Sequence, residues 1–129
     1  ASGCILLIDY GYLRPASKST LQSVMKHKKN DLLNNLGKAD ITSHVNFRLL
    51  NEFFKKKNLK VQKVVSQKFF LERMGIINRA NLLSKKMNFR DQSKLFLRLK
   101  RLIDPNQMGE LFKVVIGYKF KPVKFLGFN

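Results

Sequence analysis

Acidic residues are scarce in this sequence. Eight Asp and Glu stand against 26 Lys and Arg, so that the 129 residues carry a formal net charge of +18. A basic excess of this size suggests an anionic partner such as nucleic acid or a membrane surface. The cations are spread along every segment, however, and their spread does not predict a specific nucleic-acid partner. A basic nucleic-acid-binding module stays open as an alternative that rests on charge alone.

Cysteine and long apolar runs are also scarce. The single cysteine, Cys4, cannot form an internal disulfide, and its place in an apolar segment predicts a small buried side chain in a reducing compartment. No run approaches the roughly 18 apolar residues that a membrane-spanning helix needs. We therefore expect no membrane insertion, and a location in the cytoplasm of a bacterium or in the mitochondrial matrix of a eukaryote.

Several motifs that would reveal a reaction are missing. The sequence has no G-x-G-x-x-G, no Walker loop, no Cys/His metal spacing and no serine nucleophile elbow. We therefore expect no metal site. The two histidines are His27, which is flanked by lysines, and His44, which lies between a polar turn and a helix. A lone histidine is more often structural than catalytic, and both readings of His44 stay open.

The most informative stretch is Gly3 to Tyr12, GCILLIDYGY. The apolar run Cys4 to Ile8 does not alternate, which is typical of a strand buried on both faces in an α/β sheet. Ligands of open α/β sheets bind beyond the carboxyl ends of the strands, and this places Asp9 and Tyr10 at a candidate site. The alternative is that Asp9 caps a turn and Tyr10 packs.

The next 45 residues combine one open assignment with a clear helix. Ser19 and Gln22 have capping-box spacing for a helix to Lys28, although the same segment is compatible with a strand. Residues 30–40 are rich in turn formers and predict a surface loop. Residues 47–58 have helical apolar spacing after Asn46, a plausible N-cap.

The remainder predicts strands and helices in alternation. The expected elements are a strand over 59–66, two short helices over 69–74 and 78–86 broken at Gly75, a helix over 91–103 ended by Asp104-Pro105, a turn over 107–110, and a last strand over 112–118. Strand, helix and strand over residues 4–66 form a βαβ crossover with parallel strands. The sequence therefore predicts an α/β fold.

Five segments, spaced along nearly the whole chain, resemble the C-terminal part of the MidA-like family of S-adenosylmethionine-dependent methyltransferases. They are LLIDYGY at 6–12, STLQSVMKHK at 19–28, GKADITSHVNF at 37–47, SQKFFLERMGI at 66–76 and DPNQMGELFKVV at 104–115. The family includes a mitochondrial protein arginine methyltransferase that assists assembly of respiratory complex I. The resemblance implies an enzyme of this kind, with S-adenosylmethionine as cofactor and a protein substrate that could be a complex I subunit. A non-catalytic assembly factor is the other alternative.

The resemblance also implies a place for each strand. Residues 3–11 would be the fifth strand of a Rossmann-like methyltransferase sheet, the segment around 61–66 the sixth, and residues 112–118 the seventh, antiparallel and inserted between them. The family's glycine-rich cofactor loop has no counterpart in this sequence. We therefore expect residues 1–129 to be the C-terminal fragment of a single methyltransferase domain whose N-terminal cofactor-binding half is missing. The residues that bind the cofactor cannot then be named.

The candidate site residues follow from the resemblance together with the position of the first strand. Methyl transfer to a guanidinium needs an aligned nitrogen and carboxylates that hold its charge. The expected catalytic residues are Asp9, Tyr10, Asp40 and His44, with the two acids pairing with the guanidinium and the two rings orienting it. The expected substrate-binding residues are Gly11, Thr42 and Gln67.

Overall fold

The computed structural model describes residues 2–14, 18–121 and 124–129. Its centre is a mixed sheet in which β1 (Cys4–Tyr12) and β8 (Phe112–Tyr118) pair antiparallel along seven residues, from Cys4 opposite Tyr118 to Tyr10 opposite Phe112. On its other edge β8 pairs antiparallel with β6 (Lys60–Val61) and β7 (Val65–Ser66). The short strand β5 (Val45–Asn46) runs parallel to the end of β1.

This order confirms the arrangement that the resemblance implies. The last strand lies between β1 and the strands of residues 60–66 and is antiparallel to both, so β1 is parallel to β6 and β7. The predicted single strand over 59–66 is, however, divided into two short strands. Between them Gln62 still donates its backbone N–H to the carbonyl of Ile116 at 3.1 Å, but Val64 turns into the core with 7% of its surface exposed.

The prediction that the first strand is buried on both faces is wrong for this structure. Ile5, Leu6, Leu7 and Ile8 are 36–48% exposed, and Cys4 is exposed as well. The physical cause is that β8 pairs with one edge of β1 only, while β5 reaches the other edge only at Gly11 and Tyr12. Among the described residues, no strand pairs with that second edge from Cys4 to Tyr10.

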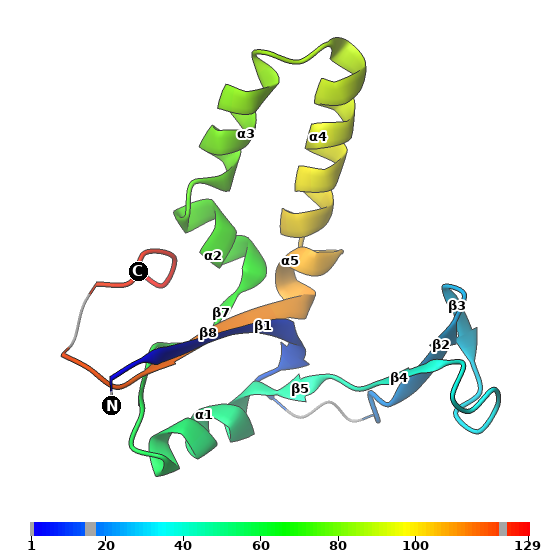
Figure 1. The fold of residues 1–129 in the computed structure, drawn as a ribbon, viewed down its shortest axis with the longest axis vertical. Coiled ribbons are helices and arrows are strands. Elements are labelled where there is room, and N and C mark those ends of the chain that lie inside the picture. The colour runs from blue at the N-terminus through cyan, green and yellow to red at the C-terminus, as the bar shows by residue number, and fades with distance from the viewer. Residues whose placement is uncertain (1, 15–17, 122–123) are drawn as a thin grey trace.

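Helices cover the sheet on two sides (Figure 1). Helix α1 (Phe47–Lys56) begins at Asn46, whose side chain accepts the N–H of Leu49 at 3.1 Å as the sequence predicts, and has Lys55 and Lys56 in its last turn. Its buried face, Phe47 and Phe54, forms the core with Val64 and Val115. Helices α2 (Gln67–Arg73) and α5 (Met108–Leu111) lie on the other side of the sheet.

Helices α3 (Ile76–Ser84) and α4 (Phe89–Ile103) form a hairpin that projects away from the sheet (Figure 1). Gly75, at a φ of 78°, separates α2 from α3 as predicted, because a left-handed backbone favours glycine. Asp104 ends α4, also as predicted. The predicted turn over 107–110 is instead the short helix α5.

The open assignment of residues 19–28 resolves to a strand. β2 (Gln22–Met25) lies between β3 (Lys28–Asn30) and β4 (Asp40–Thr42) in a three-stranded antiparallel sheet. We call residues 20–43 the arm, because Figure 1 shows them projecting sideways from the main sheet. The predicted loop over 30–40 connects β3 to β4, with Asn35 and Gly37 at positive φ.

Candidate functional site

A polar hollow of about 430 Å³ lies just beyond the carboxyl end of β1. Its lining side chains carry hydroxyl, imidazole and ammonium groups, and the residues are Tyr12, Lys18, Ser19, Thr20, Leu21, Ser43 and His44. The two segments at the base of the arm both line this hollow. They are joined by a hydrogen bond in which the backbone N–H of His44 donates to Oγ1 of Thr20 at 3.1 Å. This is the edge at which open α/β sheets bind ligands.

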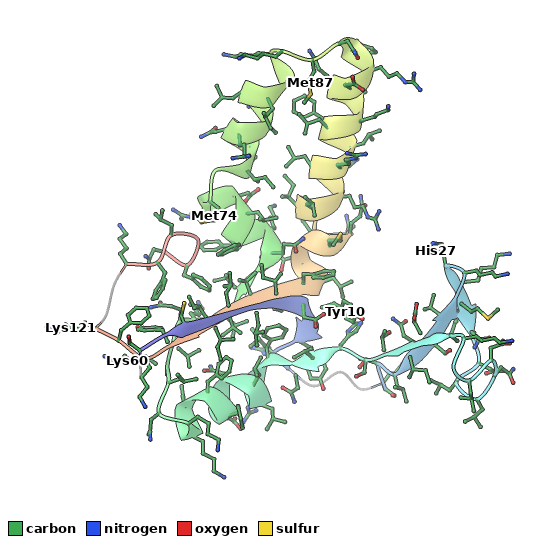
Figure 2. All side chains as sticks on the ribbon, viewed as in Figure 1. Tyr10, His27, Lys60, Met74, Met87 and Lys121 are labelled. Atoms are coloured by element: carbon green, nitrogen blue, oxygen red, sulfur yellow. The ribbon has the colours of Figure 1, made fainter. Side chains whose placement is uncertain are left out.

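Tyr10 and His44 meet beside this hollow. Their ring centroids are 5.5 Å apart in an edge-to-face arrangement, and the Tyr10 ring meets Phe112 in the same way at 5.4 Å. Figure 2 shows Tyr10 at the end of the main sheet from which the arm departs. The structure therefore brings together two of the residues that the resemblance singles out, and it fixes the tyrosine ring between a histidine and a phenylalanine.

Asp9 is half-buried and lies on the opposite face of β1 from Tyr10, because successive side chains of a strand alternate. Its Oδ1 accepts the N–H of Tyr10 at 2.8 Å. Lys113 is its register partner on β8, but the ammonium of Lys113 pairs with Glu110 instead, at 3.6 Å from Oε2. In the part of the chain that the structure describes, no ion pair involves the Asp9 carboxylate.

Gly11 lies where β1 approaches β5 and the start of α1. A Cβ at this position would come within 2.3 Å of the Val45 carbonyl oxygen and 2.7 Å of the Phe47 ring. Glycine is thus required for packing, which is a role separate from the predicted substrate binding.

Asp40 and Thr42 belong to β4 in the arm and not to the main sheet. Asp40 is exposed opposite Val24, and Oγ1 of Thr42 accepts a hydrogen bond from Nε2 of Gln22 at 3.3 Å. The structure therefore does not place these two residues beside Asp9 in the main sheet.

Gln67, predicted to bind substrate, begins helix α2 and is 6% exposed. Its Nε2 donates to the carbonyl of Leu102 near the end of α4 at 2.9 Å. The side chain is therefore engaged in joining two helices.

The hydroxyl residues that line the hollow were missed by sequence reasoning. Thr20 and Ser43 are separated by the whole arm, and only the pairing of β2 with β4 brings their segments together. Tyr12 could have been found from the sequence, because it follows Tyr10 by two residues. Residues two apart in a strand share one face, and Tyr12 ends the strand that contains Tyr10.

A larger hollow, of about 540 Å³, lies within the arm and contains none of the predicted site residues. Its lining combines aliphatic and amide side chains with one ion of each sign: Leu21, Gln22, Ser23, Lys29, Asn30, Asp31, Leu32, Leu33 and Asn34. This larger hollow is lined by no residue of β1, whereas the smaller hollow includes Tyr12 at the end of β1 and is lined mainly by polar side chains. The smaller hollow is therefore the stronger candidate.

The smaller hollow does not fit an S-adenosylmethionine molecule by the chemistry of its lining. Its lining contains no carboxylate that could hold ribose hydroxyls, and it presents the ammonium of Lys18, which would repel a cationic sulfonium. We therefore derive no cofactor contact from these residues. The arrangement can instead hold and orient a polar substrate group, with hydroxyl and imidazole groups on one face of β1 and a free carboxylate on the other.

Curated relatives match most of this chain. It is 31% identical over 112 residues to the mitochondrial protein arginine methyltransferase NDUFAF7 of Xenopus laevis and 32% identical over 111 residues to that of Homo sapiens. These alignments cover 86% and 85% of this chain and 25% of each relative. The chain thus spans about a quarter of the length of the curated relatives it matches.

Solved structures share the fold. A protein of the COG1565 superfamily from Burkholderia thailandensis superimposes with a TM-score of 0.81 at 26% identity, covering 100% of this chain and 34% of that one. A second structure from that organism, described as a likely methyl transferase bound to S-adenosyl-homocysteine, matches with the same TM-score and identity over 97% of this chain and 34% of that one. The α/β fold expected from the resemblance is confirmed.

A sequence model of one family, described as "Putative S-adenosyl-L-methionine-dependent methyltransferase", matches residues 1–65. The matched half contains β1, the arm and helix α1, and therefore the Tyr10–His44 contact and the polar hollow. The chain belongs to this family of S-adenosyl-L-methionine-dependent methyltransferases.

Proposed function

We propose that this chain forms the substrate side of an enzyme that transfers a methyl group from S-adenosylmethionine to an arginine side chain of a protein. The observation that carries the proposal is the half-buried Asp9 carboxylate, three residues before the end of β1, which has no ion pair among the described residues. A half-buried carboxylate without an ion pair can accept a cationic partner, and a guanidinium would pair with it through two hydrogen bonds. The names of the curated relatives support arginine as the methyl acceptor.

In this proposal the cofactor supplies an electrophilic methyl group, and the chain holds the nucleophile. Asp9 would pair with the guanidinium, hold its positive charge and orient the nitrogen that receives the methyl group. The attacking nitrogen then loses its proton to solvent. Tyr10 and His44 orient the substrate segment from the other face of the strand, where their rings already pack together. Asp40 remains a predicted catalytic residue, and Gly11, Thr42 and Gln67 remain predicted substrate-binding residues.

The substrate that fits the resemblance is a subunit of respiratory complex I. The corresponding compartment is the mitochondrial matrix in a eukaryote, as the names of the mitochondrial relatives suggest, or the cytoplasm in a bacterium. Among the described residues, no helix is both long enough and apolar enough to cross a membrane. Incubation of a reconstituted full-length protein with purified complex I subunits and isotopically labelled S-adenosylmethionine tests this part, and methylarginine in one subunit is the expected result.

The Asp9→Asn variant tests the role of the carboxylate. The change removes the charge and leaves the size, so methyl transfer by a reconstituted full-length protein that contains residues 1–129 should fall by about a hundredfold, which corresponds to roughly 2.7 kcal/mol of transition-state stabilisation. The readout is labelled methylarginine formed per minute, checked by mass spectrometry.

Asp31→Asn is the matched control, because Asp31 is an exposed acid on the arm. Its activity should equal that of the wild type. Full activity of Asp9→Asn, or wild-type turnover in the folded fraction of an unstable Asp9→Asn, would show that Asp9 is a structural residue.

We also propose that the contacts to the cofactor come from protein outside residues 1–129. The proposal rests on the unsuitable lining of the polar hollow and on the absence of the family's glycine-rich loop from this sequence. Calorimetric titration of the 129-residue chain with S-adenosylmethionine should give no measurable heat of binding. Micromolar binding by this chain would refute the proposal.

A further inference from the structure

The tip of the α3–α4 hairpin combines one aromatic side chain with three cations. Phe89, the first residue of α4, is 84% exposed. Lys85, Lys86 and Arg90 surround it in sequence and are all exposed. Figure 2 shows this end of the hairpin, marked by Met87, directed away from the main sheet. A large apolar side chain is therefore exposed among cations at the end of the hairpin.

The tip is ordered by its own hydrogen bonds. Nε2 of Gln92 donates to the carbonyls of Ser84 and Met87, each at 3.0 Å, and so ties the first turn of α4 to the connecting turn. Oδ1 of Asn88 accepts the N–H of Asp91 at 3.0 Å and caps the helix. The connection is therefore held in one shape, with Phe89 and the cations directed outward.

The hairpin as a whole is strongly basic. Residues 76–103 include eight Lys and Arg and one acid, Asp91. Asp91 is already engaged, since its carboxylate accepts from Asn88 and lies 3.7 Å from the Lys94 ammonium. No described carboxylate pairs with Lys85, Lys86 or Arg90. The tip therefore presents positive charge without paired carboxylates, together with the exposed apolar side chain of Phe89.

We propose that the tip of the α3–α4 hairpin is a peripheral contact with anionic lipid bilayers. Phe89 enters the boundary between headgroups and acyl chains, and Lys85, Lys86 and Arg90 bind lipid phosphates around it. Such a contact lies on the membrane surface and needs no spanning helix. It is independent of the proposed arginine methylation, and it would hold the protein beside a membrane.

The shape of the tip favours a bilayer over other anionic partners. The tip is convex, whereas recognition of a peptide helix or strand uses a groove or a sheet edge. Single-stranded nucleic acid binds through aromatic side chains on which successive bases stack. The exposed apolar residues in the last turn of α3 are instead aliphatic, namely Leu82 at 65% and Leu83 at 45% exposure.

Vesicle co-sedimentation tests the proposal, with vesicles of phosphatidylcholine alone and with vesicles containing about one third phosphatidylglycerol. The protein should partition to the anionic vesicles only. Phe89→Ser should weaken partition by about fivefold or more. Lys85→Ser with Lys86→Ser should weaken it by roughly 25-fold, because each cation near an anionic surface contributes about fivefold.

The arm supplies matched controls. Leu33 is 83% exposed, so Leu33→Ser makes a comparable change elsewhere, and Lys28→Ser with Lys29→Ser removes the same charge from β3. Both should bind vesicles like the wild type. Equal losses in the arm variants, no partition of the wild type, or tighter Phe89-dependent binding to a single-stranded oligonucleotide or an acidic peptide than to anionic vesicles would overturn the proposal.

Discussion

Gly11 shows how one missing side chain permits the junction between the sheet and the first helix. The Phe47 ring, which is fully buried, occupies the space that a side chain at position 11 would need. Because Phe47 is also the first residue of α1, the close approach of β1 sets where that helix begins. The position is thus determined by packing, even though it is adjacent to residues that we assign to the substrate.

Gly11→Ala should therefore destabilise the protein. The added Cβ meets the backbone oxygen of Val45, which cannot move away as a flexible side chain could, and we expect the free energy of unfolding to fall by about 1–3 kcal/mol or more. Urea denaturation followed by circular dichroism measures the change. Gly3→Ala is the control, since nothing lies within 4 Å of a Cβ at Gly3; equal midpoints for the two variants would contradict this account.

At the scale of the elements, the hydrogen bond from Gln67 to Leu102 joins the start of α2 to the end of α4. The last carbonyls of a helix have no partner within the helix, and the amide of Gln67 satisfies one of them. The bond spans 35 residues of sequence, and it anchors the base of the α3–α4 hairpin to the helix beside the sheet.

Gln67→Leu keeps the size of the side chain and removes this bond. We expect the free energy of unfolding to fall by about 1–3 kcal/mol, because a partly buried carbonyl loses its donor. Gln22→Leu, at an exposed position on β2, should have little effect. Unchanged stability of Gln67→Leu together with a raised KM for the protein substrate would show that Gln67 binds substrate instead.

The long elements could be predicted from the sequence. They have enough apolar residues for a helical or strand period to be recognised, or a cap or breaker that marks their ends. Examples are helix α1 with its cap at Asn46, the break at Gly75, helix α4 and strand β8. The strands of the arm have three or four residues each, too few to show a period. Their pairing, and with it the polar hollow, depends on contacts between distant segments.

The exposure of β1 could not be predicted from the sequence for a different reason. Its composition predicts burial on both faces, which depends on neighbours that no local pattern specifies. In the candidate site, the sequence predicts Asp9 and Tyr10 at the end of the first strand, whereas β1 continues to Tyr12 and pairs both residues with β8. The separation of Asp40 and Thr42 from them did not follow from the sequence, because it results from the direction of the arm.

At the scale of the whole molecule, the second edge of β1 exposes both an apolar surface and unpaired backbone groups. We expect the 129-residue chain to self-associate at micromolar concentration, because such an edge recruits further strands. Leu6→Lys should shift the chain toward monomer in sedimentation velocity, since a charge on an edge strand opposes pairing. Leu33→Lys on the arm should not. A monodisperse wild-type monomer would contradict the expectation.

The central position of β8 also bears on how the protein is made. The two strands with the longest pairing are separated by about 100 residues of sequence, so β1 leaves the ribosome well before its partner. At roughly 5–20 residues per second, synthesis of the intervening segment of about 100 residues takes about 5–20 s. Throughout that interval the apolar nascent strand has no β8 to pair with. The order of synthesis thus makes the newly made chain a client for chaperones that bind extended apolar segments, whereas the arm, whose strands pair with one another, can fold as soon as it emerges.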